Sequence, residues 1–403
     1  MNQEANLVVQ CATAYLSSAG LAPLNAALAG YIDWDELQRT AKQQSMTPVV
    51  ASMLTRHCSA RVPPKICHRL REQLRHTAQV NLAAVHEWQR VLKLLASAGI
   101  CAISIKGPAL ALLAYRNFVM REFIDLDLLV RPIDVVKTRD VLLKEGYQLS
   151  SPVVSDSDSS LLRSLNRELG FVNEEHGTFV EVHWGLLHKM FPFQLPVDQL
   201  FESACLECYD GLSFLSLSHE YLLLYLCAHG TKHCWSTLQW ICDVACYVQT
   251  VQDELDWELC IRQAEATNCG LVLKHSLLLA QQLLGLEPPS KIRNYVCGDA
   301  KALALANTAS TFLFRNGHEL GYSEALRYHL AFAKGWRDRI RFVLERVFVP
   351  AEQDWQKLRL PRPFYFLYYL VRPARFITER FSNTKPMSSD PVRSGSEAPP
   401  KGR

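Results

Sequence analysis

Three acidic residues stand in apolar sequence of the kind that forms β-strands. Asp125 and Asp127 alternate with apolar residues from Ile124 to Leu128, and Glu181 is embedded likewise in a later strand candidate. Residues two apart on a strand share a face, so the two aspartates should point together while Ile124 faces the core. Like charges held side by side are unfavourable unless a cation or a proton lies between them. We therefore predict that Asp125 and Asp127 hold a divalent metal.

Glu181 has two candidate roles at such a site. It could be a third metal ligand from a neighbouring strand, or the base that takes a proton from an acceptor group. The alternatives without chemistry are a solvated strand edge for the Asp125 and Asp127 pair and the outer face of an edge strand for Glu181. The strongly apolar flanks of the pair favour the metal site.

A turn suited to anions precedes the two aspartates. A strand candidate over residues 100–105 ends at Lys106 and Gly107, and Pro108 suits the first turn of the helix that follows. Free backbone amides, the positive end of the helix dipole and a glycine together favour a phosphate, and Lys106 adds a charge. Arg121 is expected either to contact a phosphate or to neutralise the acidic pair. Carboxylates that hold magnesium beside such a turn are what phosphoryl or nucleotidyl transfer needs.

Alternating strand and helix patterns position these residues. After the first strand and its helix, the pattern predicts a strand over 123–130, a helix over 133–146, a loop over 150–160, and a hairpin of strands over 168–173 and 178–184. We therefore predict an α/β (α+β) fold with a small mixed sheet, flanked by N-terminal and C-terminal helical regions. The predicted division is a helical region 1–97, a core 98–217, a helical domain 218–335, a basic-aromatic segment 336–383 and a disordered tail 384–403.

The segment 356–380 combines cations with aromatic rings. Its only acid is Glu379, and phenylalanines and tyrosines lie among its basic residues. These basic residues are Lys357, Arg359, Arg362, Arg372, Arg375 and Arg380. Such a segment can be a packed helix with extended arginines, a helix on a membrane surface, or a nucleic-acid contact. All three interpretations stay open at this point.

The overall composition is that of an ordinary globular protein. The chain has 403 residues, of which 49% are hydrophobic and 21% charged. Its formal net charge of +3 is too small to indicate a nucleic-acid partner. The first basic residue is Arg39, and no run of 18 apolar residues occurs, so neither a leader peptide nor a spanning helix is expected. The 13 cysteines are odd in number and scattered, which is typical of reduced thiols. We expect a cytoplasmic protein, with a peripheral membrane contact through 356–380 as an option.

The motifs in combination resemble a known family. The order is Ile-Lys-Gly-Pro-Ala-Leu, Arg-x-x-x-Asp-Leu-Asp-Leu-Leu-Val-Arg-Pro, Gly-Tyr and Val-Glu-Val-His-Trp, followed by His229-Gly-Thr-Lys-His233 with Trp235, Leu238, Trp240 and Asp243. Over about residues 80–250 this is similar to the uncharacterised nucleotidyltransferase family of the polymerase-β-like superfamily.

The resemblance implies a nucleotidyltransferase core followed by a helical domain that closes over the nucleotide. It puts Lys106 and Gly107 on the first-strand motif, Asp125 and Asp127 on the metal pair, and Glu181 on the third acid. Two departures stand out: the superfamily usually has Gly-Ser or Gly-Gly in place of Lys-Gly, and its third acid is more often aspartate. The implied cofactor is Mg²⁺ or Mn²⁺, and the implied substrate is a nucleoside triphosphate such as ATP.

The segment His229–His233 has three candidate roles. The two histidines are four apart, on one helical face, and Lys232 lies beside them. A zinc protease would need glutamate where Gly230 stands, which excludes that class. A zinc site with a nearby cysteine and a pair of packed histidines are alternatives. We favour contact of Lys232 and His233 with the nucleotide or the acceptor.

The predicted function is therefore magnesium-dependent transfer of a nucleoside monophosphate to an acceptor hydroxyl. The acceptor class stays open among sugars, metabolites, peptides, proteins and RNA. One alternative is a catalytically weak nucleotide-binding scaffold that recruits a partner or a membrane surface. Another is a toxin-like enzyme that nucleotidylates tRNA, which the arginines of 336–380 permit.

Overall fold

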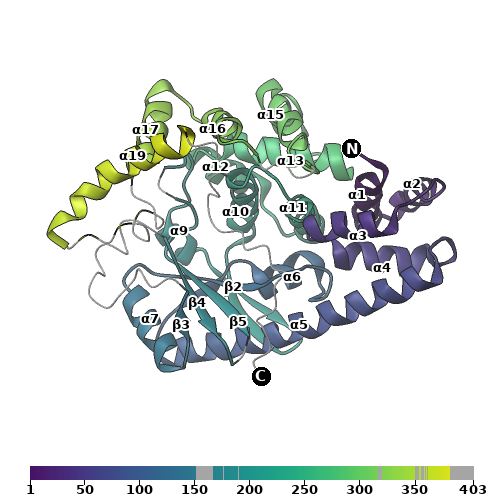
Figure 1. The fold of residues 1–403 in the computed structure, drawn as a ribbon, viewed down its shortest axis with the longest axis horizontal. Coiled ribbons are helices and arrows are strands. Elements are labelled where there is room, and N and C mark those ends of the chain that lie inside the picture. The colour runs from purple at the N-terminus through teal and green to yellow at the C-terminus, as the bar shows by residue number, and fades with distance from the viewer. Residues whose placement is uncertain are drawn as a thin grey trace.

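The computed structural model describes residues 1–150, 167–175, 177–188, 190–315, 320–349, 354, 358, 360 and 362–381. Most of the loop predicted over 150–160 and the tail predicted over 384–403 lie outside these residues. Within them the chain forms one mixed sheet surrounded by helices (Figure 1).

Helices fill the chain before the sheet. They are α1 (Gln3–Leu16), α2 (Leu21–Ala27), α3 (Trp34–Gln43), α4 (Thr47–His57) and α5 (Pro64–Ser97). Asp33 caps α3 by accepting hydrogen bonds from the amides of Asp35 and Glu36. The C-terminal half of α5 packs on the sheet: Trp88 donates a hydrogen bond to the Ser104 hydroxyl (2.9 Å) and lies edge-on to Phe214. This long helix therefore belongs to the layer that covers the sheet (Figure 1).

The sheet has seven strands in the order β3-β4-β5-β2-β1-β7-β6. They are β1 (Ala102–Ser104), β2 (Asp125–Val130), β3 (Gln148–Leu149), β4 (Glu168–Asn173), β5 (Thr178–His183), β6 (Cys205–Tyr209) and β7 (Leu212–Ser216). β2 runs parallel to β5 and β1 runs parallel to β7, while the other neighbours are antiparallel. The predicted α/β character and mixed sheet are confirmed.

Helices α6 (Gly107–Tyr115) and α7 (Val135–Lys144) connect the first strands, as the sequence predicts. The prediction that Ile124 faces the core is wrong. β2 begins at Asp125, one residue after Ile124 and two after the predicted start of the strand. The Ile124 side chain is 71% exposed.

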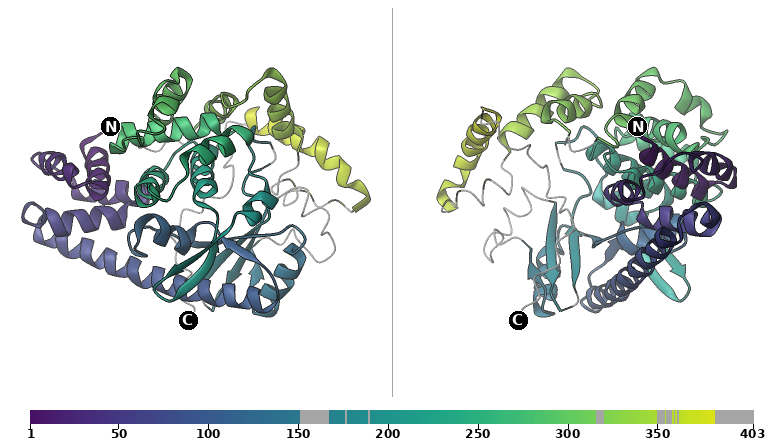
Figure 2. Two further views of the ribbon diagram at one scale, coloured as in Figure 1. Left: turned by 180° about the vertical axis from the view of Figure 1, so that it is seen from behind. Right: turned by 45° about the vertical axis from the view of Figure 1, so that its right-hand side comes forward.

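A second helical layer follows the sheet. It contains α10 (His219–Lys232), α11 (Leu238–Val251), α12 (Trp257–Ala266), α13 (Gly270–Leu284), α14 (Arg293–Cys297), α15 (Ala300–Ser310) and α16 (Tyr322–Leu330). The short helix α9 (Val197–Glu202) lies between β5 and β6 in the chain. α10 and α11 pack against each other and against α13, between the sheet and the outer helices (Figure 1). At the edge of the molecule lie α17 (Trp336–Phe348), the 3₁₀-helix Arg362–Leu367 and α19 (Tyr368–Phe381) (Figure 2).

The cysteines behave as the sequence predicts: all 13 are free thiols. None of the helices in the described part of the chain is long and apolar enough to cross a membrane.

A buried ion pair joins the second helical layer to the sheet. Arg121 donates from Nε and Nη2 to the two carboxylate oxygens of Asp243 on α11, at 2.9 and 3.0 Å. The Tyr115 hydroxyl donates to the same carboxylate (2.8 Å), and Asn81 donates to the Arg121 carbonyl (2.9 Å). Both charged side chains are almost fully buried. This pair fixes the segment that enters β2 against α11.

We predict that Asp243→Asn lowers the free energy of unfolding by about 3–5 kcal/mol, because it leaves the Arg121 guanidinium buried without a counter-charge. Urea unfolding followed by circular dichroism measures the change. The matched control is Glu72→Gln, which breaks an exposed pair with Arg75 and should cost less than about 1 kcal/mol. Equal effects of the two substitutions would contradict the structural role of the Arg121–Asp243 pair.

Candidate functional site

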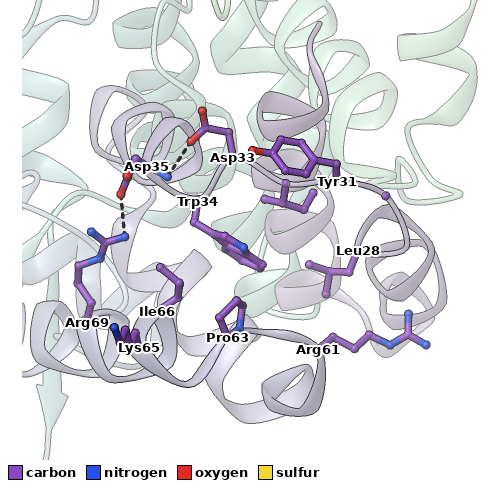
Figure 3. Close-up of a pocket in the computed structure, with 12 residues that line it drawn as sticks. Leu28, Tyr31, Asp33, Trp34, Asp35, Arg61, Pro63, Lys65, Ile66 and Arg69 are labelled. Atoms are coloured by element: carbon purple, nitrogen blue, oxygen red, sulfur yellow. Dashed lines mark hydrogen bonds and ion pairs between the residues drawn. The ribbon is translucent and has the colours of Figure 1, made fainter.

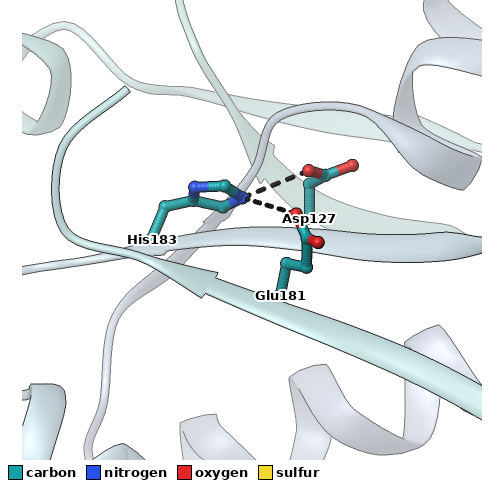
Figure 4. Close-up of side chains that lie close together, drawn as sticks. All are labelled: Asp127, Glu181 and His183. Carbon is teal, nitrogen blue, oxygen red and sulfur yellow. Dashed lines mark hydrogen bonds and ion pairs between the residues drawn. The ribbon is translucent and has the colours of Figure 1, made fainter. Parts of the chain in front are cut away.

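The parallel pairing of β2 with β5 brings two of the predicted acids together. In this register Asp127 lies directly beside Glu181, and the antiparallel neighbour β4 places Glu168 beside His183. Because alternate residues share a face, Glu181 and His183 of β5 point to the same side as Asp127. Figure 4 shows the three side chains converging from the two strands.

Asp127 is the centre of this group. Its side chain is fully buried, and its Oδ1 atom lies 3.0 Å from Lys106 Nζ and 3.2 Å from His183 Nε2. The His183 ring also lies 3.5 Å from Glu181 Oε2 through Nε2 and 3.3 Å from Glu168 Oε2 through Nδ1. We call Asp127, Glu181, His183, Lys106 and Glu168 the acid cluster.

Burial and neighbouring charges shift the pKa values of these groups in different directions. Burial alone would raise the pKa of Asp127, but Lys106 and the hydrogen-bonded His183 outweigh it and lower that pKa. The pKa of Asp125 is raised, first by burial and then by the charge of Asp127. Burial opposes the charged form of His183, yet its acidic partners raise its pKa well above the ordinary value. When Lys106 and His183 are both protonated, the protein itself supplies two cations to Asp127.

The donor set fits a divalent metal. One ligand atom each from Asp127, Glu181 and His183 lies within 4.8 Å of the other two. The second Asp127 oxygen, Oδ2, is buried and accepts no hydrogen bond from any residue that the structure describes. A buried carboxylate oxygen without a partner is costly, and a cation would satisfy it. Both carboxylates supply the oxygen ligands that magnesium and manganese prefer.

Gly107 shapes the turn between β1 and α6. Its φ of +56° lies in the left-handed region, and a Cβ atom there would be 2.7 Å from the backbone oxygen of Asp125. Lys106 is the N-cap residue of α6, so its side chain reaches Asp127 from the positive end of that helix. Only a residue without a side chain lets the helix start this close to β2.

Two predicted site residues take other positions. Asp125 is half-buried next to the acid cluster, but none of its atoms belongs to the group of three ligand atoms within 4.8 Å. Arg121 was expected at a phosphate or at the acidic pair. One edge of its guanidinium, Nε and Nη2, instead donates to the two carboxylate oxygens of Asp243. It positions the start of β2.

His183 and Glu168 are the members that the sequence analysis did not assign. The alternation that placed Glu181 in a strand also puts His183 on the same face, so the signal for the histidine was present. Glu168 reaches the cluster only through the pairing of β4 with β5, which a hairpin prediction without its register does not give.

Rings from α10 and α11 lie together near the acid cluster. The His229 and His233 rings are 4.6 Å apart at their centroids, and Trp240 lies 5.4 and 5.1 Å from them. All three are half-buried. Burial first, with help from Lys106, lowers the pKa of both histidines well below the ordinary value, so both rings are neutral at pH 7. We call His229, His233 and Trp240 the ring cluster.

A separate groove lies among the N-terminal helices. It has a volume of about 920 Å³, and Trp34, Pro63 and Ile66 form its floor while Arg69 pairs with Asp35 at its edge (Figure 3). None of the residues of the acid cluster or the ring cluster lines it. The groove is therefore no part of the candidate site.

We predict that Gly107→Ala costs about 1–3 kcal/mol of stability more than Gly146→Ala. Both glycines have positive φ, but a Cβ at Gly146 meets nothing within 4 Å, whereas one at Gly107 collides with the Asp125 carbonyl. Urea unfolding of the two variants isolates the cost of the collision. Equal losses would show that α6 does not need this close approach.

Comparison with known proteins agrees with this geometry. A search of curated proteins and a search of solved structures each gave no match. The family model described as uncharacterised nucleotidyltransferase matches residues 31–285, which include every member of the acid cluster and the ring cluster. The chain belongs to this uncharacterised nucleotidyltransferase family.

Proposed function

We propose that this protein transfers a nucleoside monophosphate from a nucleoside triphosphate to an acceptor hydroxyl. The observation that carries the proposal is the convergence of Asp127, Glu181 and His183 beside the N-terminus of α6, in a chain of a nucleotidyltransferase family. Metal-ligating carboxylates next to an anion-binding helix end are what this reaction requires.

Asp127 and Glu181 would hold the divalent ion, with Asp125 beside them. When bound, magnesium or manganese neutralises charge on the triphosphate and on the leaving pyrophosphate. His183 contacts both carboxylates and would serve as their hydrogen-bond donor while it is protonated, or as a nitrogen ligand after it has lost that proton.

The remaining residues hold the substrate and take the proton. The acceptor oxygen bonds to the α-phosphorus, the bond from that phosphorus to the bridging oxygen breaks, and pyrophosphate leaves. Lys106, at the N-terminus of α6, would contact a phosphate oxygen, and Gly107 would keep the helix end open to it. As the alternative to metal ligation, Glu181 would take the proton of the acceptor hydroxyl; 26% of its side chain is exposed, whereas Asp127 is fully buried.

The ring cluster is proposed to hold the nucleotide base. Neutral imidazoles and an indole provide flat surfaces on which a base can stack. Lys106 lies close enough to lower the pKa of His229 and His233, which relates the rings to the proposed phosphate contact. Lys232, the last residue of α10, would then lie beside the nucleotide.

One observation supports the rival function, a nucleotide-binding scaffold with weak or no catalysis. Lys106 and His183 already neutralise Asp127 within the protein, so a metal must compete with two internal cations. Calorimetry with ATP and magnesium, followed by a pyrophosphate-release assay, separates the two functions. Binding without release would favour the scaffold.

We expect Asp127→Asn and Glu181→Gln each to lower transfer of label from α-labelled triphosphates by at least about 100-fold, because each removes a negative ligand. The assay offers ATP, GTP, CTP and UTP, with sugars, peptides, proteins and tRNA as acceptors. Paramagnetic resonance of Mn²⁺ checks that metal affinity falls in the same variants. The control is Asp253→Asn, an exposed acid outside the site.

Wild-type transfer by Asp127→Asn would reject the catalytic proposal. Melting curves of every variant show whether a loss of activity reflects a loss of fold. The conclusion rests on variants that melt like the wild type.

A second expectation separates base binding from phosphate binding. Trp240→Leu should weaken ATP binding by about 1–3 kcal/mol, the range for one stacked base, and leave binding of inorganic tripolyphosphate unchanged. Calorimetry in magnesium with both ligands makes the comparison. Equal loss for the two ligands would show that Trp240 supports the fold instead of the base.

A further inference from the structure

Exposed apolar side chains concentrate in one short stretch near the end of the described chain. Half of the large hydrophobic side chains that are exposed in the described residues lie between Trp336 and Leu370, under a tenth of the sequence. Single exposed apolar residues are ordinary, but a concentration of them marks an interaction surface.

Helix α17 presents a continuous apolar stripe to solvent. Its members recur every four residues and are 67%, 49%, 50% and 43% exposed in the order Trp336, Ile340, Leu344 and Phe348. The opposite side carries Phe342, which is buried and lies 6.0 Å from Phe191 and 6.1 Å from His329. At 3.6 residues per turn these are two different faces of the helix. One face attaches α17 to the protein, and none of the residues that the structure describes buries the other.

Arginines border the stripe. α17 contains four arginines against two acids, Asp338 and Glu345. Helical geometry puts Arg337 and Arg341 along one border of the stripe and the exposed Arg339 toward the other. Arg346 lies on the packed side, where it contacts Met190. The Arg337 guanidinium lies 5.4 Å from the Trp336 ring, and Arg341 pairs with Glu345 at 2.8 Å. The exposed face is therefore apolar along its centre, with Arg337 and Arg341 at one edge and Arg339 toward the other.

The neighbouring helix uses its arginines differently. Arg375 forms a hydrogen-bonded ion pair with Asp354 at 2.5 Å, and Arg372 lies 3.6 Å from the same carboxylate. All three side chains are buried, so two of the cations that suggested a contact through 356–380 point inward. α19 packs against α17 at the periphery of the molecule (Figures 1 and 2). Four of the nine exposed apolar side chains thus form one continuous face on α17, and the other five lie between Leu358 and Leu370.

We propose that the Trp336–Phe348 face binds an anionic lipid surface. Aromatic and aliphatic side chains enter the boundary between headgroups and acyl chains, and the flanking arginines contact lipid phosphates. A second copy of the chain is disfavoured as the occupant, because a two-fold contact would set the arginines of both helices against one another. This inference is independent of the proposed transfer reaction.

Flotation of the full chain with vesicles tests the proposal. Vesicles of phosphatidylcholine with phosphatidylserine should carry the protein, and vesicles of phosphatidylcholine alone should carry much less. Trp336→Ser with Leu344→Ser should lower the partition coefficient by about tenfold or more, since two apolar anchors are lost. Arg337→Gln with Arg339→Gln should remove the preference for the anionic vesicles. The control is Ile133→Ser with Leu206→Ser, which changes exposed apolar residues on other elements.

Quenching by brominated lipid gives a second readout. Trp336→Phe keeps the surface apolar, so it should float like the wild type while losing most of the quenching of tryptophan fluorescence. The proposal is overturned if the full chain does not float, or if the serine variant and the control float equally. It is also overturned if sedimentation shows a dimer that the serine variant dissociates, since the face would then bind a second copy.

Discussion

The parallel pairing of β2 with β5 sets the positions of Asp127, Glu181 and His183 at the candidate site. Parallel strands in register put Asp127 beside Glu181, and the period of two then adds His183 on the same face. The result is a set of carboxylates too close together to stay charged without cations among them. Lys106, from the start of α6, and His183 supply that charge within the protein. The structure around β2 can be understood as the means of holding these four side chains in place.

The local secondary structure around the site was predictable because it depends on short-range patterns. Alternation in 124–128 and 178–184 predicted strands with acids on one face, and Pro108 after Lys106 and Gly107 predicted the start of a helix. These signals need only a few neighbouring residues. The prediction for Ile124 was wrong because the pattern gives the alternation but not the residue at which pairing begins.

Other parts depend on contacts between residues far apart in the chain. Arg121 finds Asp243 across 122 positions, and neither residue carries a local sign of its partner. The strands β6 and β7 were not predicted, and β7 joins the sheet beside β1 by a pairing that no local pattern indicates. Glu168 likewise reaches His183 only through the register of two strands. Tertiary pairing decides these positions, so propensity and periodicity could not.

The Arg121–Asp243 pair also bears on which fragments of this chain can fold. A fragment that holds the sheet but ends before α11 would keep Arg121 and Tyr115 in its interior without the carboxylate that both contact. The Arg121 guanidinium would then be an uncompensated charge in the core of the fragment. The boundaries of a fragment should therefore not be chosen from the strands alone. For gene fusion, shuffling or crystallisation, a fragment that contains the sheet should extend at least through α11. The sheet and α11 should therefore be kept together in any fragment.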